Sequence, residues 1–204
     1  MRLYFSPGAC SLAPHIVARE AGLPFELERV DLRTKKTASG KDYLRINPKG
    51  YVPALEIDGD DVLTEVPAIL LYLADQKPDA RLAPLAGTLA RYRLIEMLAY
   101  IGTEIHKSYS PLFNDKTPAA FREDRLALLR RRYALLDEKL GMRPYLVGET
   151  PSVADAYLFT VTQWAKKFAL DLTPFPNIVA FEQRMGARPA VIGALAAEAE
   201  AKAA

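Results

Sequence analysis

The chain has 204 residues, 50% of them apolar, and its 27 Lys and Arg side chains nearly balance 25 Asp and Glu side chains, for a net charge of +2. This composition is typical of a folded globular protein with one large or two small domains. Neither residues 1–80 nor residues 81–204 carry the strong positive excess that phosphate-backbone binding needs. We therefore expect no nucleic-acid partner.

Cys10 is the single cysteine of the chain. One cysteine excludes an internal disulfide, a Cys-x-x-Cys redox pair and a multi-cysteine zinc site, and it fits a reducing compartment. No apolar run approaches the roughly 20 residues that cross a bilayer. The first residues also lack the apolar stretch of a signal peptide. We therefore expect a cytoplasmic protein with no membrane partner.

Residues 1–78 alternate between strand and helix patterns. Residues 25–30 alternate with the period of a half-buried strand, whereas Pro14 lies in the first turn of a helical run that Gly22 ends. The predicted strands are Leu3–Phe5, Phe25–Val30, Ala54–Ile57 and Val62–Thr64, the last two joined by a hairpin turn at Asp58–Asp61. The predicted helices are Ser11–Ala21, a short one at Asp42–Arg45, and Glu65–Gln76 capped by Thr64. This order predicts a small sheet covered by helices.

The remainder of the chain is predicted to be helical. Residues 79–86 form a linker, and residues 87–204 form an all-helical domain whose last residues, 194–204, fray. Ser152 and Asp155 have the spacing of a capping box at a helix start. The predicted helices are Gly87–Ser108, Phe121–Leu140, Ser152–Phe168, Pro176–Gly186 and Pro189–Ala201. The architecture is therefore an α/β module followed by an all-α module.

Cys10 is the first candidate for chemistry because it follows a strand and directly precedes a helix. A thiol at a helix N-terminus faces free N–H groups and the positive end of the helix dipole, which favour the thiolate. A free cysteine is also among the residue types most often buried, so a purely structural thiol is the alternative.

Two further segments offer backbone groups to a ligand. A cis Val52–Pro53 bond would leave the Val52 N–H and C=O unpaired and able to bind an extended peptide; a tight turn with no ligand is the alternative. The helix start at Glu65 and Val66 is an anion site, with the Val66 N–H for a carboxylate and Glu65 for an ammonium group. The alternative is an acid that only complements the helix dipole.

The helical module offers Ala99, Thr103 and His106, whose spacing places them on one helix face. A lone histidine on an amphipathic helix is usually structural. A metal site using His15 and His106 is discounted, because no third ligand has a suitable spacing.

Five motifs together resemble the glutathione S-transferases, and most closely their bacterial beta class. They are Tyr4–Leu12, Asn47–Leu55, Thr64–Ile69, Thr103–Lys107 and Ser152–Leu158. The resemblance covers the whole chain. It implies a thioredoxin-like N-terminal domain at residues 1–78, an all-α C-terminal domain, a homodimer, and glutathione as cosubstrate with no other cofactor. The implied activity joins the glutathione thiolate to a small hydrophobic electrophile.

The resemblance also implies roles for individual residues. Cys10 lies beside the glutathione sulfur, and Thr103 and His106 face that sulfur from the helical domain. The residues that hold the tripeptide are Lys35, the Val52 backbone before cis-Pro53, Glu65 and the Val66 N–H. Many relatives have Ser at the position of Val66, so we expect a weaker hold on glutathione here. The position of Ala99 can carry Asn in the class, and its absence removes a polar contact near the sulfur.

Two alternatives to conjugation remain open. In the first, Cys10 itself forms a mixed disulfide with glutathione in a thiol-disulfide reductase. Ala13 stands where a second thiol would be, so a second glutathione would have to resolve that disulfide. In the other, the chain is a non-enzymatic protein of the same fold that binds apolar ligands.

Overall fold

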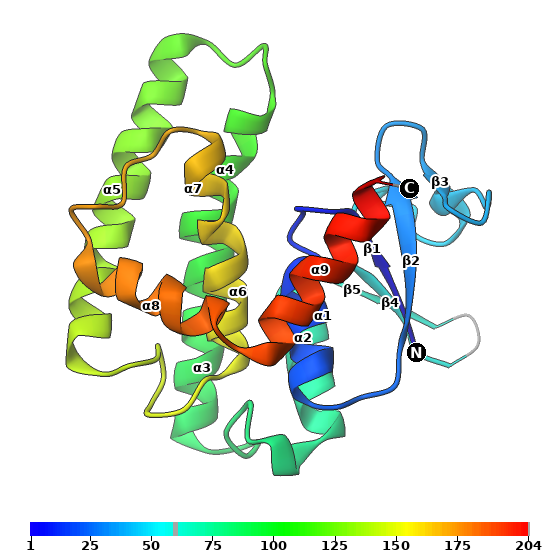
Figure 1. Ribbon diagram of the computed structural model, residues 1–204, viewed down its shortest axis with the longest axis horizontal. Helices are drawn as coiled ribbons and strands as arrows, with labels where there is room; N and C mark the ends of the chain where they lie inside the picture. Colours follow the sequence, from blue (N-terminus) through cyan, green and yellow to red (C-terminus); the bar gives the residue numbers. More distant parts are fainter. Residues whose placement is uncertain (59–60, 204) are drawn as a thin grey trace. The chain divides into compact units, whose positions relative to one another are not determined.

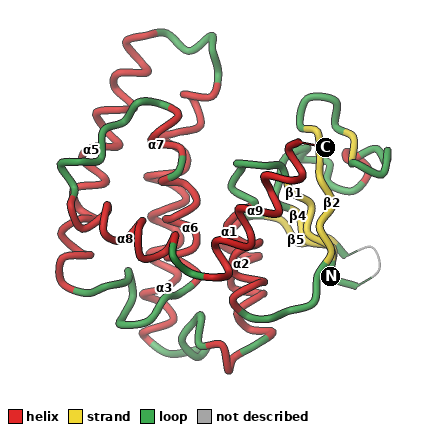
Figure 2. The backbone as a smooth tube through the Cα atoms, viewed as in Figure 1, coloured by secondary structure: helices red, strands yellow, loops and turns green. Residues whose placement is uncertain are grey.

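The computed structural model describes residues 1–58 and 61–203. The chain divides into two compact units, Met1–Ala83 with Arg188–Ala204, and Pro84–Ala187. Figure 1 follows the chain by colour, and Figure 2 shows that the described strands all lie in the first unit.

The first unit is built on a five-stranded mixed sheet with the strand order β3-β2-β1-β4-β5. Its strands are β1 (Arg2–Phe5), β2 (Glu26–Asp31), β3 (Lys36–Thr37), β4 (Ala54–Glu56) and β5 (Val62–Thr64). Strand β1 pairs in parallel with β2, which requires a crossover, and α1 (Leu12–Glu20) supplies it. The predicted strands are confirmed, and the two-residue strand β3 was not predicted. In the predicted hairpin turn, Gly59 and Asp60 lie outside the described residues.

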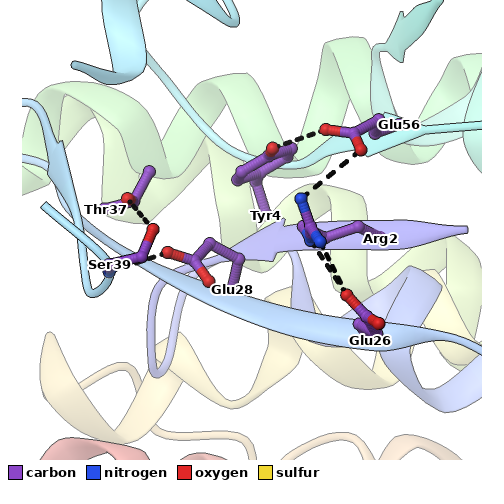
Figure 3. A network of polar contacts seen from close by, with 7 residues as sticks. All are labelled: Arg2, Tyr4, Glu26, Glu28, Thr37, Ser39 and Glu56. Carbon is purple, nitrogen blue, oxygen red and sulfur yellow. Dashed lines mark hydrogen bonds and ion pairs between the residues drawn. The ribbon is translucent and has the colours of Figure 1, made fainter. Parts of the chain in front are cut away.

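Polar side chains join the three central strands across one face of the sheet (Figure 3). Arg2 on β1 pairs with Glu26 on β2 at 2.8 Å and with Glu56 on β4 at 3.4 Å. The Tyr4 hydroxyl donates to Glu56 at 2.6 Å. Burial, followed by this bond, raises the pKa of Tyr4 to about 12. The phenol is therefore a protonated donor at neutral pH, and its hydrogen bond joins β1 to β4.

Helices α1, α2 (Val66–Gln76) and α9 (Pro189–Ala203) belong to the same unit as the sheet, and α1 packs against both of the others (Figure 1). This differs from the expected helical domain at 87–204, because α9 joins the first unit instead of the second. The predicted fraying of 194–204 is wrong as well, since α9 runs to Ala203 and buries Ala194 and Glu198.

The second unit, Pro84–Ala187, is helical in the described structure. Its elements are α3 (Leu89–Tyr100), the π-helix η3 (Ile101–His106), α4 (Lys107–Tyr109), the 3-10 helix η4 (Ser110–Phe113), α5 (Ala119–Met142), α6 (Val153–Thr162), α7 (Trp164–Lys167) and α8 (Pro176–Gly186). Residues 87–108 were predicted as one helix, but the π-helix interrupts it. The expected linker 79–86 contains the end of a 3-10 helix at Pro78–Ala80, and the two units meet at Ala83 and Pro84.

The predicted capping box at the start of α6 is present. The Asp155 carboxylate accepts from the Ser152 N–H at 2.7 Å and from the Leu146 N–H at 2.8 Å. It therefore joins the helix start to the preceding loop. Over the ranges that the structure describes, no helix has both the length and the apolar character needed to span a membrane.

Candidate functional site

Cys10 lies in the turn between β1 and α1, half-buried, with its Sγ 3.4 Å from the Val52 carbonyl oxygen. Ser11 follows it as the residue that precedes α1. The Ser11 hydroxyl accepts from the Ser6 N–H at 3.2 Å and lies 3.3 Å from the Ser6 oxygen, which closes the turn. The sequence thus places the thiol at the N-terminal end of α1, where the helix dipole favours an anion.

The Val52–Pro53 peptide bond is cis, as predicted. The expectation that both backbone groups of Val52 stay unpaired is wrong for the carbonyl, because its oxygen accepts from the Cys10 thiol. The neighbouring Tyr51 carbonyl accepts from the Tyr43 hydroxyl at 3.0 Å and from the Asn47 amide at 2.8 Å. These two side chains hold the strand-like segment opposite Cys10.

Charged side chains flank this segment. The Lys35 ammonium donates to the Gly50 carbonyl at 2.6 Å. The Lys49 ammonium donates to Glu65 at 2.7 Å and to the Thr64 hydroxyl at 2.9 Å, and the bond to Glu65 raises the pKa of Lys49. Two cations and one carboxylate therefore lie along residues 49–53 and the start of α2.

Helix α2 begins at Val66 and not after a Thr64 cap. Glu65 is the residue before the helix, with a left-handed φ of 72°, and no side chain caps the helix. Thr64 is the last residue of β5 and its hydroxyl accepts from Lys49 instead, so the predicted Thr64 cap is wrong. As the first helical residue, Val66 has an N–H that no carbonyl of the helix can accept.

The second unit carries Ala99, Thr103 and His106. Ala99 and Thr103 are exposed, and the Thr103 hydroxyl donates to the Ala99 carbonyl at 3.0 Å. His106 is half-buried, with Nδ1 at 2.7 Å from the Tyr157 hydroxyl and its ring edge-on to Trp164 at 5.0 Å between centroids. The imidazole is thus fixed in orientation by α6 and α7. In neither described range does a group of three His, Cys, Asp or Glu side chains approach metal-binding geometry.

The structure brings the predicted residues together in two groups, one in each compact unit. Cys10, Lys35, Val52, Glu65 and Val66 belong to the first unit, whereas Ala99, Thr103 and His106 belong to the second.

Sequence reasoning missed four residues that hold these groups in place: Tyr43, Asn47, Lys49 and Tyr157. Three of them, Asn47, Lys49 and Tyr157, lie inside the motifs already singled out. The partners of Lys49 and Tyr157 are 16 and 51 positions away, so no local pattern points to them, whereas Asn47 bonds to Tyr51 within its own motif.

Both parts of the chain are similar to one known family. Residues 8–76 match the N-terminal domain model of glutathione S-transferases, and residues 100–189 match the C-terminal domain model. The chain is 46% identical over 198 residues to the glutathione S-transferase GstA of Escherichia coli O157:H7, covering 97% of this chain and 98% of that protein.

Two solved structures are similar over nearly their whole length. A sphingomonad glutathione S-transferase complexed with glutathione has a TM-score of 0.95 at 45% identity, covering 98% of this chain and 99% of that one. The beta-class enzyme of Sphingomonas chungbukensis has a TM-score of 0.94 at 46% identity, covering 97% and 98%. The predicted thioredoxin-like and all-helical parts are therefore confirmed. The chain belongs to the glutathione S-transferase family, in its bacterial beta class, and is a glutathione transferase.

Proposed function

We propose that the first unit binds glutathione with its sulfur beside Cys10. The carrying observation is the 3.4 Å contact between the Cys10 thiol and the Val52 carbonyl, with Lys35, Lys49 and Glu65 along the same segment. Glutathione has two carboxylates, one ammonium group and two peptide bonds. Two ammonium groups, one carboxylate, an extended backbone and a helix start complement it group by group.

Each end of the tripeptide has a counterpart in the first unit. The glycyl carboxylate would pair with Lys35, and the cysteinyl peptide would bind the backbone of Val52. The γ-glutamyl carboxylate would take the Val66 N–H at the start of α2, and its ammonium group would take Glu65. The Lys49 ammonium group pairs with the Glu65 carboxylate in this structure, so the ligand's ammonium group would compete with Lys49 for that carboxylate.

Chemistry in this proposal begins with the glutathione thiolate, because the thiol form is a poor nucleophile. The thiolate would lie at the start of α1 beside Cys10. Resemblance to the beta class assigns Cys10 and His106 as its hydrogen-bond donors and assigns Thr103 and Ala99 to positions near the sulfur. The thiol proton passes to water as the thiolate forms. The thiolate attacks the electrophilic carbon of a second substrate and forms a carbon–sulfur bond while the bond to the leaving group breaks; with an aryl chloride, chloride departs with that electron pair. The second substrate would be a small hydrophobic electrophile. This choice is supported by the aromatic rings of Tyr157 and Trp164, which pack on His106, and by those of Tyr109 and Phe113, which pack on Trp164.

The test is calorimetric titration of the protein with glutathione, followed by assays of the Cys10→Ala variant. Conjugation to an activated nitroaryl chloride should fall by about tenfold or less, because Cys10 is one of two donors. No heat of binding at millimolar glutathione would overturn the proposal in favour of a binding protein. Retained conjugation with complete loss of glutathione-dependent disulfide reduction would show that Cys10 acts there as a covalent nucleophile.

We also propose a homodimer working in the cytoplasm. A half-buried cysteine that forms no disulfide fits a reducing environment. Exposed apolar side chains before and along the beginning of α3 form a stripe that a second copy would cover: Leu85 precedes the helix, and Leu89, Tyr92 and Ile95 lie on it.

A further inference from the structure

Helix α9 delivers a buried carboxylate to the turn that carries Cys10. Glu198 is only 4% exposed, and its Oε2 accepts a hydrogen bond from the Gly8 N–H at 2.9 Å. Gly8 is two residues before Cys10 and has a left-handed φ of 75°, a conformation that glycine adopts without strain. The turn is thus tied to a residue 190 positions away along the chain.

His15 lies on the other side of the same carboxylate. It is fully buried, and its Nε2 accepts from the Arg19 Nε–H at 2.9 Å. The proton of a neutral imidazole must then be on Nδ1, which is 3.6 Å from the second Glu198 oxygen. Within the described ranges, neither Nδ1 of His15 nor Oε1 of Glu198 has a hydrogen-bond partner.

Packing of α9 alone does not explain a buried Glu198, because a smaller apolar side chain would stabilise the helix better. A buried carboxylate with a single short hydrogen bond costs free energy, whereas an alanine would complete the apolar face of the helix at no such cost. The beginning of α9 already has a strong anchor, since Arg188 pairs with Glu20 at the end of α1, at 2.5 Å and 2.8 Å. What Glu198 adds is a hold on the Gly8 backbone.

We propose that Glu198 is a positioning residue for Cys10. By fixing the Gly8 N–H, it sets the turn Ser6–Cys10 and keeps the thiol against the Val52 carbonyl, where the glutathione sulfur is to lie. The inference rests on the role proposed above for Cys10. It predicts that the position of the Cys10 thiol depends on the acceptor oxygen of residue 198 and not on the charge of its carboxylate.

The experiment compares four variants. Glu198→Ala removes the acceptor, and Glu198→Gln keeps an acceptor but removes the charge. Arg188→Ala loosens the other end of α9 without touching the turn, and Glu200→Ala changes an exposed acid on the same helix. Each is measured for the rate of Cys10 alkylation by iodoacetamide in the free protein, for kcat and KM with glutathione, and for melting temperature.

Glu198→Ala should release the thiol, so that alkylation becomes about tenfold faster while kcat/KM falls by about tenfold. Glu198→Gln should stay within about threefold of the wild type in both, since the Gly8 bond is kept. Arg188→Ala should lower the melting temperature with little change in either rate, and Glu200→Ala should change nothing.

Two results would overturn the proposal. One is a Glu198→Ala protein whose alkylation rate matches that of the wild type or of Arg188→Ala. The other is a Glu198→Gln protein as altered as Glu198→Ala, which would assign the effect to charge. The alkylation assay contains no glutathione, so it decides the position of the turn even if calorimetry rejects the glutathione site.

Discussion

In the proposed glutathione site, Val66 offers the γ-glutamyl carboxylate a backbone N–H and no side-chain donor. It is buried at the start of α2, and its side chain has no hydroxyl to add to the backbone N–H. We expect Val66→Ser to lower KM for glutathione about fivefold relative to Val66→Ala, which corresponds to ~1 kcal/mol for one added hydrogen bond. The gain should be equal in the ground and transition states, so kcat should not change.

The two variants form a matched pair because both remove the buried valine methyls. Any loss of stability from the smaller side chain is shared, and the difference between them isolates the hydroxyl. Steady-state kinetics at saturating electrophile measures it. An equal KM in the two variants would show that no carboxylate lies at this helix start.

Two aromatic side chains hold His106 of the second unit in place. The Tyr157 hydroxyl holds its Nδ1, and Trp164 packs on its ring. We expect His106→Ala to lower kcat by roughly 100-fold, the lower end of the range for loss of one positioned proton donor. Because the ring is only half-buried, the melting temperature should fall by no more than a few degrees.

Tyr157→Phe provides the companion measurement, since it keeps the ring and removes the hydroxyl that orients His106. Its kcat should lie between those of the wild type and His106→Ala. If His106→Ala lost activity only in proportion to its loss of folded protein, the histidine would be structural.

The capping box shows which elements a sequence can specify. Ser152 and Asp155 are three positions apart, and one local pattern contains both partners of the bond. Strand β3 has only two residues, and the π-helix after Tyr100 adds a residue per turn without any change in the apolar pattern. Glu65 takes a left-handed φ that glycine usually adopts, so sequence reasoning placed the cap one residue early.

Asp155 should stabilise the protein through the backbone groups it satisfies. In Asp155→Ala, the N–H groups of Ser152 and Leu146 lose a buried acceptor. We expect the free energy of unfolding to fall by about 2 kcal/mol or more, because the cap is lost and the two donors are left unpaired. Urea unfolding at neutral pH measures this, and an unchanged midpoint would contradict the role of the box.

The same carboxylate should make stability depend on pH. Burial raises the pKa of Asp155 to about 6 from 3.8, against the lowering effect of its hydrogen bonds. The native state therefore binds this proton more tightly than the unfolded chain, so stability falls as pH rises through about 4 to 6, by about 3 kcal/mol in all. Asp155→Asn should lack this contribution.

The check is the difference in unfolding free energy between the wild type and Asp155→Asn, measured from pH 4 to pH 8. Other titrating groups cancel in the difference. The wild type should lose stability relative to the variant as the pH rises. A constant difference, or one that grows in favour of the wild type, would show that the hydrogen bonds outweigh the burial.

At the scale of the whole molecule, the two-part architecture was predictable and the place of α9 was not. Local periodicity indicates that 189–201 is helical, but the partners of this helix are near the other end of the chain. Arg188 meets Glu20, and Glu198 meets Gly8. The same limit applied to Lys49 and Glu65, which are 16 positions apart. Contacts of this kind depend on the folded arrangement, and no window of sequence contains both partners.

The proposed dimer is tested at the exposed stripe of α3. Leu89 and Tyr92 are 72% and 62% exposed, one helical turn apart, and apolar side chains so exposed favour burial against a partner. We expect the wild type to run at about twice 22.6 kDa in light scattering. The double variant Leu89→Glu and Tyr92→Glu should run as a monomer, because like charges would face each other across the two-fold axis.

A matched control makes the same kind of change on another exposed face. Ile192 and Leu195 on α9 are also exposed and also one turn apart, so Ile192→Glu with Leu195→Glu adds the same charge without touching α3. This control should remain dimeric. Dissociation by the α9 pair alone would move the interface to that helix, and a monomeric wild type would reject the dimer altogether. Retention of the dimer by the α3 variant would show that the stripe is not where two copies of the chain meet.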